Sequence, residues 1–142
     1  MFNQIAQTIP YQQITVEGFE ISIKRLDLVH PHISGNKFFK LKYNLLAARQ
    51  QGYKKLLTFG GAYSNHIAAT AYAAQLFGFE SQGIIRGEEL TSKALNATLS
   101  TAQQFGMQLQ FVTREAYRQK QSPAYLAQLQ QDYPEYYVIP EG

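Results

Sequence analysis

The chain of 142 residues contains no cysteine, which excludes disulfide bonds, thiolate metal sites and cysteine nucleophiles. No apolar run approaches the roughly 20 residues that cross a membrane, and no basic start followed by an apolar stretch marks a secretory signal. Charged residues make up only 16%, and the basic ones are scattered apart from Lys37, Lys40 and Lys42. We therefore expect a cytoplasmic protein that binds neither membrane nor nucleic acid.

What is present is typical of a folded domain. Apolar residues make up 45% of the chain, and its length suits one domain with a core rather than two. Helical spacing and helix-stopping glycines predict helices, and short apolar runs predict strands, in alternation. The expected helices cover 37–50, 64–77, 92–105 and 125–131, and the expected strands cover 55–59, 81–85, 109–112 and 136–139.

Such alternation predicts an α/β fold, with a four-stranded parallel sheet and helices on both faces. Before it, residues 12–27 alternate apolar and polar side chains around Glu17-Gly18, which predicts a β-hairpin. A seam near Gly52 would divide the chain into 1–51, with the hairpin and first helix, and a small α/β domain over 52–142. Ligands of parallel sheets bind beyond the carboxyl ends of the strands.

Lys37 is the first candidate for chemistry, because it follows a Gly-Asn loop at the start of an expected helix. A lysine there could bind a carbonyl cofactor such as pyridoxal phosphate, whose anionic group a helix start attracts. Lys40 would share its helix face, and repulsion between the two amines would lower the pKa of Lys37. The alternative, which spacing alone favours, is a solvated basic helix face.

A second candidate is Ser64-Asn65-His66, which follows an expected strand and Gly60-Gly61. Ser64 could act near a reacting carbon and Asn65 could donate a hydrogen bond to a phenolate-type oxygen. Capping of the helix would explain the serine equally well, and a lone histidine on a helix is more often packed or exposed than catalytic. The glycines would turn the chain, and their amides could cradle an anion.

Two further segments give weaker indications of function. Arg86-Gly87-Glu88 follows an expected strand and could face a ligand, although a surface loop explains it as well. His30 and His32 are spaced as metal ligands could be, but no third ligand is evident, so we expect no metal site.

Taken together, these segments resemble one family, the 1-aminocyclopropane-1-carboxylate deaminases and D-cysteine desulfhydrases. The resemblance covers the chain from about Ile21 onward and rests on SGNKFFKLKYNL, LLTFGGAYSNHIAATA, GIIRGEE, GMQLQFVTREAYR and VIPEG in this order. It implies a pyridoxal 5'-phosphate enzyme of the tryptophan synthase β-like fold, acting on a small amino acid and forming a homo-oligomer. Family members are longer, so the chain resembles a truncated, N-terminal half.

The resemblance also implies roles. Lys37 matches the lysine that carries the cofactor covalently, and Asn65 matches the asparagine that hydrogen-bonds its ring hydroxyl. Ser64 matches the serine beside the substrate, which binds its carboxylate or helps move a proton. Asn36 and His66 are the remaining expected cofactor-binding residues. His66 stands where the deaminase branch has glutamine, which favours the desulfhydrase branch or other relatives.

Departures from the family leave alternatives open. Phe39 replaces a basic residue common in the lysine motif, which makes the local charge around Lys37 less certain. The absent half would supply the Gly-rich phosphate loop, the partner of the pyridine nitrogen and the substrate-facing tyrosines. The fragment could therefore be impaired alone, or be a catalytically silent domain that pairs with a partner chain. A general anion-binding α/β module is a further possibility.

Overall fold

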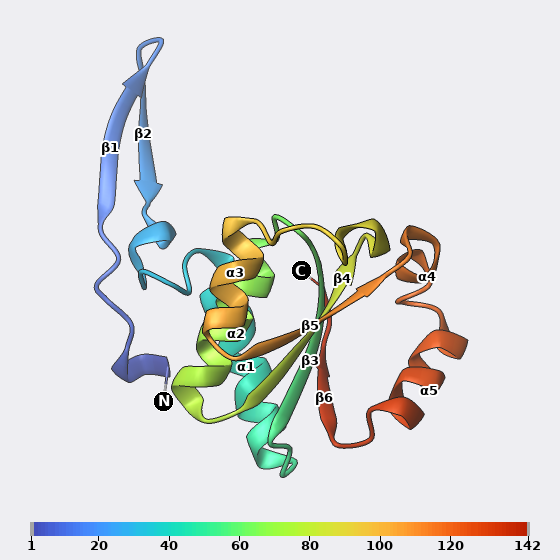
Figure 1. Ribbon diagram of the computed structural model, residues 1–142. Coiled ribbons are helices and arrows are strands. Elements are labelled where there is room, and N and C mark those ends of the chain that lie inside the picture. Colours follow the sequence, from blue (N-terminus) through green and yellow to red (C-terminus); the bar gives the residue numbers. More distant parts are fainter. Residues whose placement is uncertain (1, 142) are drawn as a thin grey trace.

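A parallel β-sheet forms the centre of the computed structural model, which describes residues 2–141 (Figure 1). Its strands lie in the order β5-β4-β3-β6, and all of their pairings are parallel. They are β3 (Lys55–Gly61), β4 (Glu80–Arg86), β5 (Met107–Val112) and β6 (Tyr136–Ile139). The predicted α/β class and four-stranded parallel sheet are therefore confirmed.

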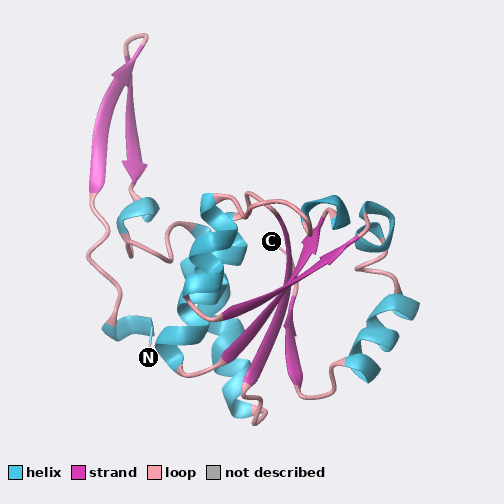
Figure 2. Ribbon diagram, in the orientation of Figure 1, coloured by secondary structure: helices cyan, strands magenta, loops and turns pink. Residues whose placement is uncertain are grey.

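Helices cover both faces of this sheet (Figure 2). One face packs against α1 (Asn36–Gln50), α2 (Asn65–Phe77) and α3 (Ala97–Gln104), and the other against α4 (Arg114–Arg118) and α5 (Pro123–Asp132). The alternation of side chains along β3 divides the core. Leu56 packs in the cluster with α1 and α2, whereas Leu57 and Phe59 pack in the cluster with α4 and α5.

The predicted hairpin is also confirmed. β1 (Tyr11–Val16) and β2 (Phe19–Lys24) pair antiparallel, and Glu17 and Gly18 connect them with φ angles of 51° and 85°. Positive φ at both central residues is what a tight hairpin turn requires. The hairpin projects away from the sheet and its helices (Figure 1), and its strands are almost wholly exposed.

Two expectations about local structure are wrong, and one helix was not expected. Gly60-Gly61 does not turn the chain but extends β3, opposite Ile85 and Arg86 of β4. The third helix begins at Ala97 rather than Ser92, because the Asn96 side chain caps it. A short helix, α4, was not expected, and its cap is a hydrogen bond from the Ala116 amide to the Thr113 side chain.

The remaining elements are short 3₁₀ turns: η1 (Phe2–Gln4), η2 (Leu26–Leu28) and η3 (Glu88–Leu90). Among residues 2–141, no helix is both long and apolar enough to cross a bilayer. The division of the chain near Gly52 stays a prediction.

Candidate functional site

The loop before Lys37 is held by a histidine. The Nδ1 atom of His30 accepts hydrogen bonds from the amides of His32, at 3.1 Å, and Ile33, at 3.2 Å. The Gly35 amide then donates to the Leu26 carbonyl at 2.9 Å, and Gly35 adopts a φ of 61° at the start of α1. Because an L side chain disfavours that φ, glycine lets the chain enter the helix here.

Helix α1 places Lys37 at the edge of the core. Phe38, Leu41 and Leu45 turn inward and are fully buried, whereas Lys37 is half-buried. The adjacent Asn36 is exposed. The first residues of α1 therefore present polar side chains beside a fixed apolar layer.

The segment from Gly60 to His66 is positioned by a close approach of β3 and α2. A Cβ atom added to Gly60 would lie 2.3 Å from Cγ1 of Ile67 and 2.9 Å from Cβ of Ser64, so only glycine fits. Ser64 then caps α2, its side-chain oxygen accepting from the Ile67 amide at 3.4 Å. Asn65, the first residue of α2, is exposed.

These two helix starts meet at one cavity of about 400 Å³. Its lining includes Lys37, Asn36 and Asn65, together with Pro31, His32, Ser34, Gly35, Ala68 and Ala69. Within residues 2–141, the side chains of Lys37 and Asn65 make no hydrogen bond or ion pair. An amine and an amide therefore face the same space with their hydrogen-bonding capacity unused.

Ser64 and His66 are placed differently. Neither lines this cavity, and His66 is buried, with 3% of its surface exposed. Its Nε2 atom lies 2.9 Å from the Thr58 hydroxyl, which donates its hydrogen to the Ile139 carbonyl at 2.9 Å. Since a hydroxyl has one hydrogen, His66 Nε2 must be the donor to Thr58, which leaves Nδ1 without a proton.

Charge and burial keep His66 neutral. Burial lowers the pKa of His66 to about 4, and the positive charges of Lys40 and Lys37 add to this effect. Its Nδ1 atom is buried and has no hydrogen-bond partner within residues 2–141. At neutral pH the side chain thus acts as a polar core residue, and Thr58, to which it donates, was not singled out from the sequence.

The other lysines of α1 are engaged elsewhere. The Lys40 amine donates to the Pro140 carbonyl at 2.5 Å, and burial, followed by the charge of Lys37, lowers its pKa. The Lys42 amine donates to Oδ1 of Asn3 at 2.9 Å. The three lysines of α1 therefore do not form one basic helix face, because Lys40 and Lys42 bind other parts of the chain. Of the three, only Lys37 lines the cavity.

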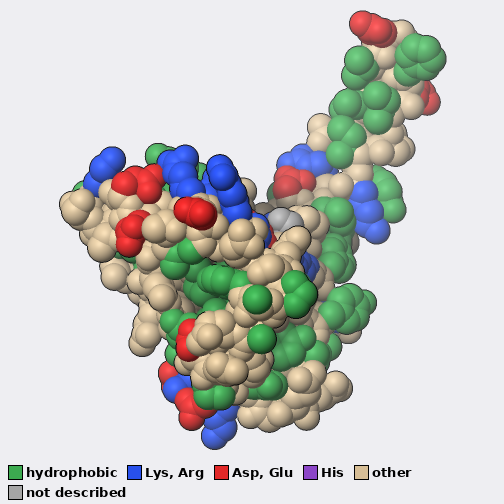
Figure 3. Space-filling model, turned by 90° about the vertical axis from the view of Figure 1, so that its right-hand side faces the viewer, with side chains coloured by type: hydrophobic (Ala, Val, Ile, Leu, Met, Phe, Trp, Pro, Cys, Tyr) green, Lys and Arg blue, Asp and Glu red, His purple; other side chains and the backbone are tan. Residues whose placement is uncertain are grey.

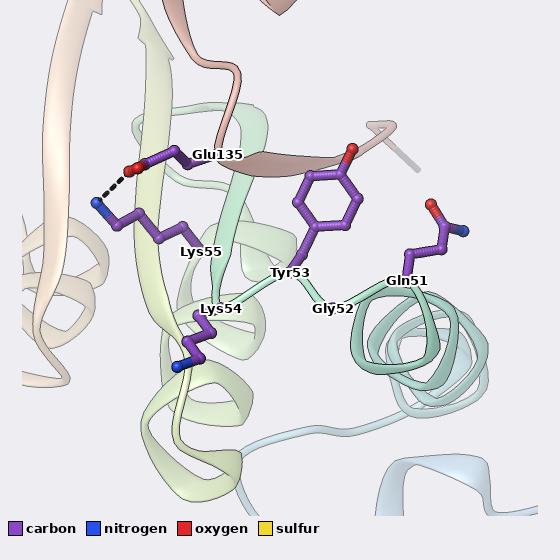
Figure 4. Close-up of a pocket in the computed structure, with 6 residues that line it drawn as sticks. All are labelled: Gln51, Gly52, Tyr53, Lys54, Lys55 and Glu135. Carbon is purple, nitrogen blue, oxygen red and sulfur yellow. Dashed lines mark hydrogen bonds and ion pairs between the residues drawn. The ribbon is translucent and has the colours of Figure 1, made fainter.

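Two observations bear on other sites. Among residues 2–141, no group of three or more His, Asp or Glu side chains could hold a metal ion. A cavity of about 450 Å³ lies near the amino ends of β3 and β6, lined by residues 51–55 and Glu135 (Figure 4). The ion pair between Lys55 and Glu135, at 2.8 Å, borders it, and none of the candidate catalytic or cofactor-binding residues lines it.

Comparisons with known proteins were made by sequence and by structure. No family model matches the chain. A Thermotoga maritima protein provisionally named 1-aminocyclopropane-1-carboxylate deaminase is 35% identical over 127 residues, covering 88% of this chain and 40% of the relative. The mitochondrial bifunctional D-cysteine desulfhydrase/1-aminocyclopropane-1-carboxylate deaminase of Arabidopsis thaliana is 31% identical over 132 residues, covering 88% of this chain and 33% of the relative.

The comparison with solved structures finds proteins similar to these relatives. A 1-aminocyclopropane-1-carboxylate deaminase homologue superposes with a TM-score of 0.74 at 27% identity, covering 96% of this chain and 42% of that one. Cysteine synthase from Entamoeba histolytica gives a TM-score of 0.66 at 14% identity, covering 98% of this chain and 42% of that one, and shares the fold alone. The chain thus spans less than half the length of the proteins it matches.

Proposed function

Because this chain belongs to the 1-aminocyclopropane-1-carboxylate deaminase and D-cysteine desulfhydrase family, we propose that it carries the cofactor lysine of a pyridoxal-phosphate-dependent lyase or deaminase. The substrate would be a small amino acid, either D-cysteine or the cyclopropane acid. One observation carries the proposal: Lys37 and Asn65, on different helices, line the same cavity with unused hydrogen-bonding groups.

The residues present fit this cofactor. A Schiff-base lysine needs an amine that is free of ion pairs, and Lys37 has none within the described part of the chain. An amide donor for a ring oxygen is available in Asn65, and the start of α2 offers backbone amides with no partner inside the helix. The cavity of about 400 Å³ gives these groups a common space.

Each residue would have a distinct task. Pyridoxal phosphate, when bound, supplies an aldehyde for an amine and a ring that withdraws electrons from the α-carbon. Lys37 would hold it covalently until a substrate amine takes its place, and the released Nζ would then move a proton at or near the α-carbon. Asn65 would orient the ring by donating a hydrogen bond to its hydroxyl, and Asn36 would line the same space.

Ser64 and His66 would act from the second helix. The Ser64 hydroxyl oxygen accepts a hydrogen bond from the Ile67 amide. The hydroxyl hydrogen of Ser64 would therefore be free to donate to a substrate carboxylate. His66 would act only indirectly, by holding Thr58 in the core with a hydrogen bond. Its low pKa keeps its imidazole neutral near neutral pH.

A second candidate, a catalytically silent domain that pairs with another chain, is favoured by a different observation. The chain spans only 40% of its Thermotoga relative, and the apolar side chains of its hairpin are exposed. Residues 1–142 alone would give the cofactor few contacts, so we expect them to bind it weakly by themselves.

Titration with pyridoxal phosphate, followed by borohydride reduction and mass spectrometry, separates the two candidates. We expect an absorbance band from lysine-linked cofactor, and a reduced adduct mapped to Lys37. Lys37→Ala should abolish both, whereas Lys42→Ala, which removes an amine from the same helix outside the cavity, should leave both intact. No adduct, or one that persists in Lys37→Ala, would support the silent domain instead.

A further inference from the structure

A small basic cavity lies on the other face of the sheet, beside α4. It has a volume of about 220 Å³ and is lined by Arg86, Arg114, Tyr117, Arg118, Lys120 and Glu141. These residues come from the end of β4, from α4 and the turn after it, and from the segment after β6. Figure 3 shows Lys and Arg side chains gathered along the top of the face that carries α4 and α5, with acidic side chains among them. None of these residues lines the cavity of Lys37.

The charges in this cavity do not balance. Arg114 is paired with Glu89 at 2.7 Å, and Lys120 is paired with Glu141 at 3.1 Å. Within residues 2–141, Arg86 and Arg118 have no carboxylate in ion-pair range. The one carboxylate side chain in the lining is therefore neutralised, and among the described residues two guanidinium groups remain without a counter-charge.

The lining of the cavity includes a buried hydroxyl group, that of Tyr117. Tyr117 is only 4% exposed, and its hydroxyl has no hydrogen-bond partner among the described residues. Burial, followed by the neighbouring Glu141, raises the pKa of Tyr117, so the hydroxyl keeps its proton. The guanidinium of Arg86 lies over its ring at 5.8 Å, and the amine of Lys120 at 4.5 Å. A buried hydroxyl that makes no hydrogen bond among the described residues is costly, so an acceptor atom of a ligand would stabilise it.

We propose that this cavity binds a phosphoryl group of a small molecule. A phosphoryl group carries about −1.5 to −2 charge near pH 7, which matches the two uncompensated guanidinium groups. Arginine guanidinium groups are suited to its oxygens, and a third donor, the Tyr117 hydroxyl, lies in the same lining. A single carboxylate would leave one of the two arginines unbalanced. The site is separate from the proposed cofactor site, and the two can be tested independently.

Isothermal titration of the whole chain with inorganic phosphate tests the proposal. We expect saturable binding, tighter than that of acetate at matched ionic strength. Arg86→Gln and Arg118→Gln should each weaken it about tenfold or more, because each removes a charged hydrogen bond. Tyr117→Phe should weaken it about threefold without destabilising the free protein, because its hydroxyl has no bond to lose.

Two controls make the result specific. Lys54→Gln removes the same charge near the amino end of β3 and should leave phosphate binding unchanged, as should Lys37→Ala. Equal loss in Lys54→Gln would show a diffuse charge effect, and loss in Lys37→Ala would assign the anion to the Lys37 cavity; either result overturns the proposal. Absent binding, or acetate binding as tight as phosphate binding, overturns it as well. Because Arg118 is exposed on α4, we expect Arg118→Gln to fold. This variant therefore tests the proposal even if Arg86→Gln does not fold.

Discussion

A single hydroxyl hydrogen determines the state of the buried histidine. Thr58 donates its hydroxyl hydrogen to the Ile139 carbonyl, so Nε2 of His66 carries the imidazole proton and donates it to Thr58. Nδ1 of His66 is then unprotonated. Three elements, β3, α2 and β6, are joined by these two bonds. Protonation of Nδ1 would place a positive charge in the core, near the amines of Lys40 and Lys37.

Stability should therefore depend on the charge of His66. Its pKa is lowered from 6.5 to about 4 in the folded chain, so below pH 6.5 the unfolded chain binds the proton more readily. The free energy of unfolding should fall as the pH drops from 6.5 towards 4, by about 2 kcal/mol at pH 5. Urea unfolding at several pH values measures this loss.

The matched variant is His66→Gln, which cannot titrate. Its free energy of unfolding should change less than that of the parent chain between pH 6.5 and 5. His30, whose pKa burial also lowers, leaves part of the slope in both proteins. Parallel curves for the two chains would contradict a buried, neutral His66.

At the residue scale, the sequence motifs singled out Lys37 and Asn65, which line one cavity, but not Thr58, the partner of His66. Lysine and asparagine follow glycine-containing segments at helix starts, which a linear motif displays. The contact between His66 and Thr58 depends on how α2 folds back over β3, and Thr58 is one polar residue within an apolar run. No spacing rule distinguishes it from a surface threonine.

At the scale of the elements, β3 and α2 approach each other closely where strand leads into helix. Gly60 has no room for a Cβ atom beside Ile67, whereas a Cβ on Gly61 would meet Nη2 of Arg86 at 3.6 Å. The two adjacent glycines therefore differ in what they permit. We expect Gly60→Ala to push the start of α2 away from the strand.

This difference gives a matched pair of variants. Gly60→Ala should lower the free energy of unfolding by about 2–3 kcal/mol through overpacking, and Gly61→Ala should change it by less than about 1 kcal/mol. Thermal or denaturant unfolding of both variants checks the prediction. Equal losses would indicate that the approach of α2 to β3 is looser than the structure shows.

The elements that sequence patterns located well are those with a strong period and a clear stop. The helix ending before Gly78 is an example, since Gly78 adopts a φ of 73° after it. The start of α3 was misplaced because Ser92 and Asn96 are both good caps, and only the fold shows that Asn96 also donates to the Ala62 carbonyl. Gly60-Gly61 resembled a turn, but close packing, not chain reversal, requires glycine at position 60.

Over the whole molecule, exposed apolar side chains gather on helix α1 and on the hairpin. Helix α1 presents Phe39, Tyr43 and Leu46 along one stripe, with exposed fractions of 38%, 66% and 36%. The hairpin adds Phe19, 73% exposed, and an isolated two-stranded ribbon is marginal in water. In a purified sample, a second copy of the chain is the available partner for these surfaces.

We therefore expect concentration-dependent self-association, visible by sedimentation velocity. Replacing both Phe19 and Tyr43 by serine should shift the population towards monomer, because it removes two large exposed apolar side chains. Tyr63→Ser is the control, since Tyr63 is 83% exposed but lies on the loop before α2. A chain that stays monomeric at high concentration, or a Tyr63→Ser variant with the same effect, would contradict this prediction.

The position of β6 in the sheet has a consequence for synthesis on the ribosome. This strand is made after the other three, yet it pairs with β3, the first of them. Until it emerges, one edge of β3 stays open, Thr58 lacks its carbonyl acceptor, and Lys40 lacks Pro140. The nascent chain thus keeps an unpaired strand edge until β6 is made, and chaperones that cover such edges should matter more for this protein than for one whose strands pair in the order they are made.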